Sequence, residues 1–316
     1  MAPIVATQPS WFYVMVVVTV LLLTELKHTF TEFAQRMKND EMITLAKFLA
    51  ISGIILPMLP HKNLIPDINL TPYSIWLATV VVSGISYLSY LLKRYVFHES
   101  GTLVSGIIGG LYSSTATISV LARKSRKASE QEATEYVAAM LLAVSMMFLR
   151  FMILILIFSR EIFLSIYPYL LTMAVVAAIV AWFIHSRQKR PEGQSAETEE
   201  DDSSNPLEFK VALIFAILFV IFTFLTHYTL VYAGTGGLNL LSFVSGFSDI
   251  TPFILNLLQN TGSVAALIIT ACSMQAIISN IMVNMFYALF FAGKGSKLRP
   301  WILGGFGAVS YTHLRA

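Results

Sequence analysis

Residues 136–158, YVAAMLLAVSMMFLRFMILILIF, form an apolar stretch whose one charged side chain is Arg150. Because a helix needs ~20 predominantly apolar residues to cross the hydrocarbon core of a bilayer, this stretch is long enough to span it. The whole chain has the same character: 56% of its 316 residues are hydrophobic, 12% are charged and the mean hydropathy is +0.71. These values exclude a soluble globular protein and predict an all-α polytopic membrane protein.

Similar apolar stretches recur along the chain between short polar clusters. Backbone groups in lipid must be hydrogen-bonded within their own segment, and the alternating pattern of a membrane β-barrel is absent, so each stretch is expected to be helical. We expect about 8 to 10 hydrophobic helices on this basis. The expected segments are 11–27, 43–60, 72–92, 102–122, 136–158, 162–185, 207–231, 238–258, 263–292 and 298–310.

A charged stretch at 187–206, RQKRPEGQSAETEEDDSSNP, is expected to be a mobile linker that separates two similar units. GGLYSSTATISVL (109–121) aligns with SGFSDITPFILNL (245–257), and AVSMMFLR (143–150) aligns with IISNIMVN (277–284). These matches occur in the same order and predict an internal duplication. The expected organisation is two N-terminal helices at 1–60, a first unit with one extra helix at 61–186, the linker, and a second unit at 207–316.

The distribution of basic residues predicts the topology. Lysine and arginine are concentrated near 27–47, 93–94, 123–127, 187–190 and 294–299, and are sparse in the intervening connections. Cytoplasmic loops of membrane proteins are enriched in basic residues, so all five clusters, and with them the linker, are expected in the cytosol. This arrangement requires the segments 102–122 and 238–258 to enter the membrane and return to the same side, which makes the two units an inverted repeat. Glycine-broken helices that cross the membrane are the alternative.

Polar residues interrupt both of these segments and are candidates for binding an ion or a solute. The first interruption contains Ser113, Ser114, Thr115 and Thr117, whose hydroxyl groups can bind a desolvated ion or a solute. The second contains Asp249 and Thr251, and an ionised carboxylate inside an apolar segment needs a cation, a partner or a proton.

Arg150 and Asn280 are the candidates from the long helices that follow these segments. An arginine at the centre of a membrane helix costs on the order of 3 kcal/mol, so Arg150 is expected to face the interior of the bundle. We expect it to pair with Asp249 across the two units. A purely structural ion pair and a solute anion bound by Arg150 are both open alternatives.

Other classes of site receive no support from the sequence. The single cysteine, Cys272, is expected to be a small buried hydrophobic residue, and the histidines lack the spacing of metal ligands. No metal, cofactor or catalytic residue is expected. A net charge of +3 gives no extensive basic surface, so nucleic acid is not an expected partner.

Five blocks of sequence resemble long prokaryotic membrane proteins of the MgtC/SapB type, and in particular their C-terminal membrane domain of unknown function. The blocks are ELKHTFTEFAQRMKNDEMITLAKFLAISGIILPMLP (25–60), GIIGGLYSSTATISVLARKS (106–125), LAVSMMFLR (142–150), NPLEFKVAL (205–213) and SGFSDIT (245–251). The MgtC-like N-terminal part of those proteins has no counterpart here, so roles linked to magnesium or virulence are not implied. The end of the chain, VSYTHLRA (309–316), resembles translated sequencing adapter, and we expect the second unit to be truncated.

The expected function is that of a multi-pass protein of the cytoplasmic membrane, transporter-like or channel-like, acting on a small ion or solute. The alternative is a regulatory or assembly subunit that does not transport, as the resemblance to MgtC-type proteins implies. An enzyme is not expected. The bilayer is the expected environment, and a second copy or another membrane protein is left open as a partner.

Overall fold

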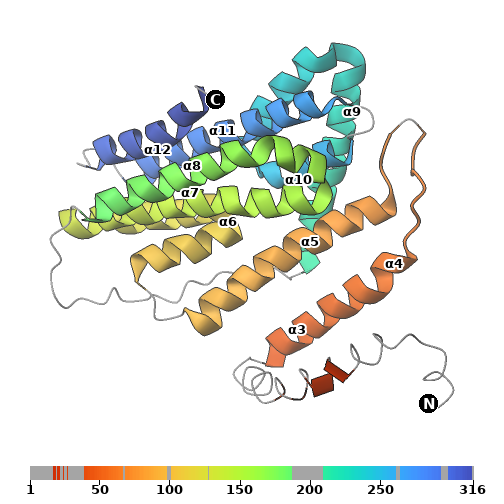
Figure 1. Cartoon of the computed structure of the whole chain (residues 1–316), viewed down its shortest axis with the longest axis horizontal. Helices are drawn as coiled ribbons and strands as arrows, with labels where there is room; N and C mark the ends of the chain where they lie inside the picture. Colours follow the sequence, from red (N-terminus) through yellow and green to blue (C-terminus); the bar gives the residue numbers. More distant parts are fainter. Residues whose placement is uncertain are drawn as a thin grey trace. The chain divides into compact units, whose positions relative to one another are not determined.

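The computed structural model describes residues 39–66, 68–97, 101–126, 128–186, 209–260, 264–292 and 298–314, together with single positions between 17 and 27 (Figure 1). These residues are almost entirely helical, and no strand occurs among them. The expected linker at 187–206 and most of the expected helix at 11–27 lie outside the described residues. The chain divides into a unit of residues 1–50, which contains α3 (Asn39–Ala50), and a unit of residues 51–316.

The second unit contains nearly all of the long helices. Its elements in chain order are η1 (Ile51–Ile55), α4 (Leu56–Met58), α5 (Pro72–Leu91), η2 (Leu92–Val96), α6 (Thr102–Ser125), α7 (Glu130–Phe158), α8 (Arg160–Ser186), α9 (Phe209–Ser245), α10 (Ile250–Gln259), α11 (Ala266–Phe291) and α12 (Arg299–Leu314). Seven helices in the described part of the chain are long and apolar enough to cross a membrane. The expectation of an all-α polytopic membrane protein is confirmed.

Helix α7 occupies the centre of the second unit. It begins with a capping box, in which the side chains of Ser129 and Glu132 each accept a hydrogen bond from the other residue's backbone N–H. Five consecutive residues, 137–141, are fully buried, so α7 contacts neighbours on all sides there. On one side the Ser145 hydroxyl donates to the carbonyl oxygen of Ala174 in α8 at 2.8 Å. Such interhelical bonds hold apolar helices in register.

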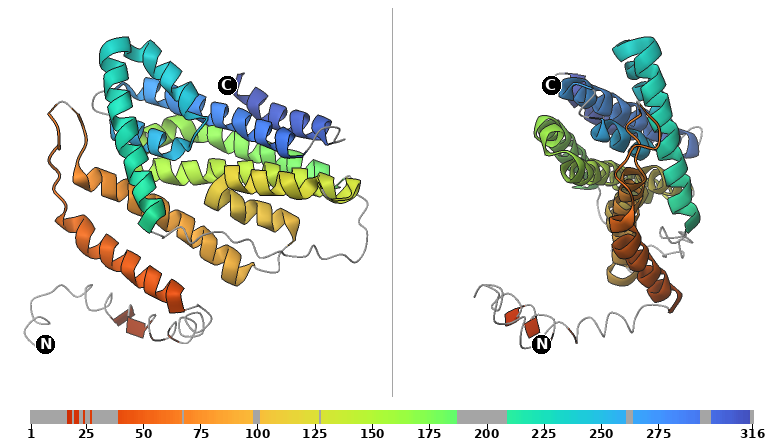
Figure 2. Two further views of the ribbon diagram at one scale, coloured as in Figure 1. Left: turned by 180° about the vertical axis from the view of Figure 1, so that it is seen from behind. Right: turned by 90° about the vertical axis from the view of Figure 1, so that its right-hand side faces the viewer.

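Helix α6 folds back on itself at Ser113, whose backbone is extended (φ −157°, ψ 105°). A side chain added at Gly109 would collide with the Thr117 hydroxyl. In an unbroken helix two residues eight positions apart are separated by ~12 Å, so this proximity requires a reversal. We call 102–125 the first hairpin, and Figure 2 shows its two arms as separate rods that meet at a tip.

The first arm of this hairpin packs very closely against α7. The backbone of Ala139 occupies the space where a side chain at Gly106 would lie, and the backbone of Ala143 does the same at Gly110. Glycines four residues apart allow two helix backbones to approach in this way. Because both pairs are in the same order, the first arm runs parallel to α7, whereas the second arm leads into α7 through a short connection and runs antiparallel to it.

The second hairpin, 235–259, has the same construction. It begins at Gly234, whose backbone conformation (φ 59°, ψ −153°) is essentially restricted to glycine. Its first arm lies along α11, where the Cys272 thiol contacts the Asn239 amide oxygen at 3.4 Å and the Ser279 hydroxyl donates to the Phe243 carbonyl at 2.7 Å. Cys272 is buried, as expected. After a turn at 246–249, α10 returns towards the start of α11.

The two hairpins are based at opposite ends of α11. At one end, Arg123 in the first hairpin lies over the ring of Phe291, 4.9 Å from its centroid. At the other end, the side chain of Asn69 donates to the carbonyl of Gln259, the last residue of α10, at 2.7 Å. Since α11 begins at Ala266 and ends at Phe291, the hairpins enter the bundle from opposite directions and their tips approach each other inside it.

Candidate functional site

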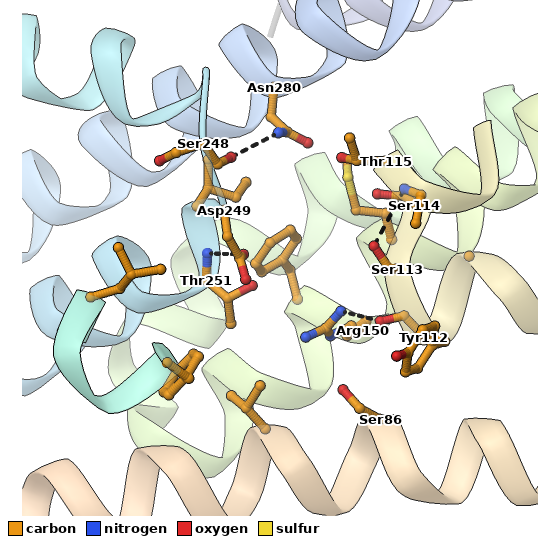
Figure 3. Close-up of a pocket in the computed structure, with 18 of the residues that line it drawn as sticks. Ser86, Tyr112, Ser113, Ser114, Thr115, Arg150, Ser248, Asp249, Thr251 and Asn280 are labelled. Atoms are coloured by element: carbon orange, nitrogen blue, oxygen red, sulfur yellow. Dashed lines mark hydrogen bonds between the residues drawn. The ribbon is translucent and has the colours of Figure 1, made fainter. Parts of the chain in front are cut away.

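A cavity of about 530 Å³ lies between the two hairpin tips and the helices around them (Figure 3). Its walls come from α5, α6, α7, α9, α10 and α11 and from the turn before α10. The polar lining residues are Ser83, Ser86, Tyr112, Ser113, Ser114, Thr115, Arg150, Ser248, Asp249, Thr251, Asn280 and Tyr287. The cavity therefore lies between the two hairpins, with a broken helix on each side of it.

The tip of the first hairpin is held by α7. Arg150 donates a hydrogen bond from Nη1 to the carbonyl oxygen of Tyr112, the last residue of the first arm, at 2.8 Å. A cation is favourable at this end of a helix because the last carbonyl groups have no partners within the helix. The next residue, Ser113, accepts the backbone N–H of Ala116 on its hydroxyl at 3.4 Å and so starts the second arm.

The tip of the second hairpin is held by α11 in a corresponding way. Asn280 donates from its side-chain nitrogen to the carbonyl of Gly246 at 3.1 Å and approaches that of Ser248 at 3.5 Å. Asp249 is the N-cap of α10, because its carboxylate accepts the backbone N–H of Thr251 at 2.9 Å. In each hairpin a residue of the following helix thus binds the carbonyl end of the first arm, and a polar side chain starts the second arm.

The expected ion pair between Arg150 and Asp249 is not formed. Both residues are described by the structure and both line the cavity, but Arg150 bonds to the Tyr112 carbonyl and Asp249 to the Thr251 amide. The expectation failed because the sequence shows that both residues lie inside apolar segments but does not reveal the space between the hairpin tips.

Seven of the eight expected site residues line the cavity: Ser113, Ser114, Thr115, Arg150, Asp249, Thr251 and Asn280. The eighth, Thr117, lies against Gly109 between the arms of the first hairpin and is not among the lining residues. The sequence analysis missed Ser83 and Ser86 on α5. Their signal is a row of small hydroxyl residues, Thr79, Ser83 and Ser86, at helical spacing in an otherwise apolar segment.

The chemistry of the cavity is that of a mixed polar and apolar site. Arg150 and Asp249 are the charged side chains among its described lining residues, and hydroxyl groups from both hairpins and from α5 surround them. Val82, Met147, Phe215 and Leu218 provide an apolar wall. Cavities of this size, with a few convergent polar groups on a mostly apolar lining, are typical of sites for small molecules.

Comparison with known proteins identifies the family. Residues 80–292 match a domain of unknown function, DUF4010, and this region contains both hairpins and α7, α10 and α11. An uncharacterized protein of Aquifex aeolicus (strain VF5) is 26% identical over 208 residues, which is 64% of this chain and 87% of that protein. No solved structure matches the chain significantly. The family match covers well over half of the chain, and the chain therefore belongs to the DUF4010 family.

Proposed function

We propose that this protein is a transporter-like or channel-like membrane protein that carries a small ion or solute through the cavity between the two hairpin tips. The observation that carries the proposal is the cavity itself, with Arg150 and Asp249 on its walls. Charged side chains within membrane segments are energetically unfavourable and usually mark the path of a solute or an ion. Broken helices are tolerated at that depth where they line a cavity, and many transporters bind their substrates there.

An inverted repeat underlies this site in our proposal. In the first hairpin Gly110 packs on Ala143 of the following helix, α7. In the second hairpin Gly246 packs on Ser279 of the following helix, α11. Gly246 lies 136 residues after Gly110, and Ser279 lies 136 residues after Ala143. The same offset separates Ser113 and Asp249, which start the second arms, and it is two residues larger than that of the aligned blocks 143–150 and 277–284. Two similar hairpins that enter from opposite ends of the bundle support an inverted repeat. Many transporter folds are built from inverted repeats.

The proposed topology follows from the same two ends. Arg123 and Phe291 lie close to the basic clusters at 123–127 and 294–299, so their end of α11 is assigned to the cytosol of a cytoplasmic membrane. Asn69 and Gln259 belong to connections with few basic residues, which are assigned to the outer side. The first hairpin then re-enters from the cytosol and the second from outside.

The proposal is tested by the water accessibility of the cavity together with solute flux. We would replace Cys272 with alanine, introduce Ser86→Cys in the cavity wall, and treat reconstituted protein with a charged, membrane-impermeant thiol reagent. Ser145→Cys is the matched control, because Ser145 is buried between α7 and α8 away from the cavity. We expect Ser86→Cys to react and Ser145→Cys to remain unmodified.

Flux into liposomes, measured for a panel of small ions and solutes, completes the test. We expect uptake of at least one solute, and loss of that uptake when Ser86→Cys is modified. A regulatory or assembly role, which the MgtC-type resemblance implies, is the competing proposal. An unreactive cavity and no flux for any member of the panel would favour it and contradict ours.

A further inference from the structure

The charges in the cavity are opposite and are carried by opposite walls. Arg150 comes from α7 beside the tip of the first hairpin, and Asp249 belongs to the tip of the second. Their hydrogen bonds go to neutral backbone groups, so neither charge is neutralised by an ion pair. Among the described residues, Nε of Arg150 is a buried nitrogen without a hydrogen-bond partner. The guanidinium group thus has donor capacity that the protein does not use.

The electrostatic balance of the site narrows the class of ligand. Each tip brings a helix carboxyl end and a helix amino end together, and these carry roughly −0.5 and +0.5 charges that cancel. The net charge of the lining is then set by one guanidinium and one carboxylate, and it is zero. A simple cation bound at Asp249 would be repelled by Arg150, and a simple anion bound at Arg150 would be repelled by Asp249, so neither gains from the net charge of the lining. A neutral solute would displace water from both groups without offering either of them an opposite charge.

We infer that the cavity binds a small zwitterion, a solute that carries one ammonium and one carboxylate group as α-amino acids do. This inference rests on the proposed function, because it names the class of solute for the same cavity. The carboxylate is bound by Arg150, whose planar donors suit two oxygens at once, and the ammonium is bound by the free oxygen of Asp249. The gap between the two side chains is then filled by the ligand, which bridges charges that the protein keeps apart.

The remaining lining suits the rest of such a molecule. Ser83 and Ser86 on α5 and Thr251 on α10 add hydroxyl residues to the lining. Met147, Phe215 and Leu218 offer an apolar wall for a short aliphatic group. A volume of about 530 Å³ is far more than a dehydrated monatomic ion requires and lies in the range of small-molecule sites.

The test compares a zwitterion with analogues that each lack one charge. We would measure the binding of L-leucine, 4-methylpentanoate, which lacks the ammonium, and 3-methylbutylamine, which lacks the carboxylate, to the purified full chain in detergent. Glycine, with acetate and methylamine, and L-alanine, with propionate and ethylamine, would extend the panel to smaller side chains. We expect at least one of the three amino acids to bind about tenfold more tightly than either single-charge analogue of its size, a difference of ~1.4 kcal/mol.

Two charge variants make the test specific. Arg150→Gln should no longer bind the amino acid more tightly than the amine analogue that lacks the carboxylate. Asp249→Asn should no longer bind the amino acid more tightly than the carboxylate analogue that lacks the ammonium. Ser145→Ala, outside the cavity, should leave all affinities unchanged. The inference is overturned if the unmodified protein prefers a single-charge analogue or binds none of the compounds, or if both variants lose the same preference.

The outcomes also separate this inference from the proposed function. Binding of an amino acid without flux through liposomes would contradict transport and leave the zwitterion site intact. Flux of an inorganic ion with no amino acid binding would support transport and overturn the zwitterion site.

Discussion

Arg150 and Tyr112, 38 positions apart in the chain, are joined by a 2.8 Å hydrogen bond from the guanidinium Nη1 to the backbone carbonyl. This bond ties the middle of α7 to the point at which the first hairpin reverses. It also explains how an arginine is accommodated in the most apolar described segment, because the guanidinium binds a carbonyl that has no helical partner and the residue lines the cavity.

Replacing Arg150 separates its structural role from its proposed binding role. Loss of a hydrogen bond from a charged group removes ~1.5–3 kcal/mol, but removal of a charge from the membrane interior returns ~3 kcal/mol. Glutamine is shorter, and its amide nitrogen replaces the arginine Nε, which has no partner, so the bond from Nη1 to the Tyr112 carbonyl is lost. We therefore expect Arg150→Gln to change the free energy of unfolding by no more than ~1.5 kcal/mol. We expect its solute affinity to fall at least about tenfold.

Thermal unfolding in detergent and ligand binding on the same preparation would check this prediction. A variant that unfolds many degrees lower, with unchanged affinity in its folded fraction, would show that Arg150 has only a structural role.

At Asp249 the cap and the charge can be changed independently. Asparagine is as good an N-cap as aspartate, whereas alanine cannot accept the Thr251 N–H. We expect Asp249→Asn to leave stability near that of the unmodified protein and Asp249→Ala to lose ~1 kcal/mol. Both should lose the proposed ammonium site. Equal loss of stability in the two variants would show that the carboxylate charge, rather than the cap, stabilises the tip.

Gly110 has a steric role that an alanine substitution tests. An added methyl group would meet the backbone of Ala143, so the first arm of the hairpin would have to move away from α7. We expect Gly110→Ala to be destabilising by ~1–3 kcal/mol. Gly307→Ala in α12 is the matched control, because nothing lies within 4 Å of the added group, and it should be neutral or stabilising. Similar melting temperatures for the two variants would contradict the close packing.

A double-mutant cycle tests the attachment of α10 to α9. The side chain of Asn256 donates to the Thr223 hydroxyl at 2.6 Å, and both residues are buried. Phe222 and Phe253 pack beside this bond, with ring centroids 5.5 Å apart. We expect Asn256→Ala and Thr223→Val to couple by ~0.6 kcal/mol, the average for such bonds between membrane helices. Additive effects on the free energy of unfolding would contradict a direct bond in the folded protein.

Much of the architecture follows from simple features of the sequence. The apolar segments predict the helices because lipid forces backbone groups to bond locally. Glycines and hydroxyl residues mark the first break near Ser113, and glycine, aspartate and proline mark the second near Asp249. Gly110, Ser113 and Asp249 among them line the cavity, since a broken helix deep in a membrane protein needs polar surroundings.

The geometry between segments could not be predicted in the same way. The distance between Arg150 and Asp249 depends on how the two tips stop short of each other, and no local pattern encodes that gap. Thr117 belongs to the same hydroxyl cluster as Ser113, yet the reversal turns it towards Gly109 instead of the cavity. Ser83 and Ser86 were missed because hydroxyl groups on a long apolar helix are also common where helices merely pack.

The opposite entry of the two hairpins is tested most directly by the sidedness of two glycine positions. Gly101 at the base of the first hairpin and Gly236 at the base of the second are both exposed, with open space around an added side chain. We would introduce Gly101→Cys or Gly236→Cys into a Cys272→Ala background. Each variant would be exposed to an impermeant thiol reagent in right-side-out and inverted membrane vesicles. We predict that Gly101→Cys reacts from the cytosolic side and Gly236→Cys from the opposite side; reaction of both from one side would contradict the inverted arrangement and the cavity between its tips.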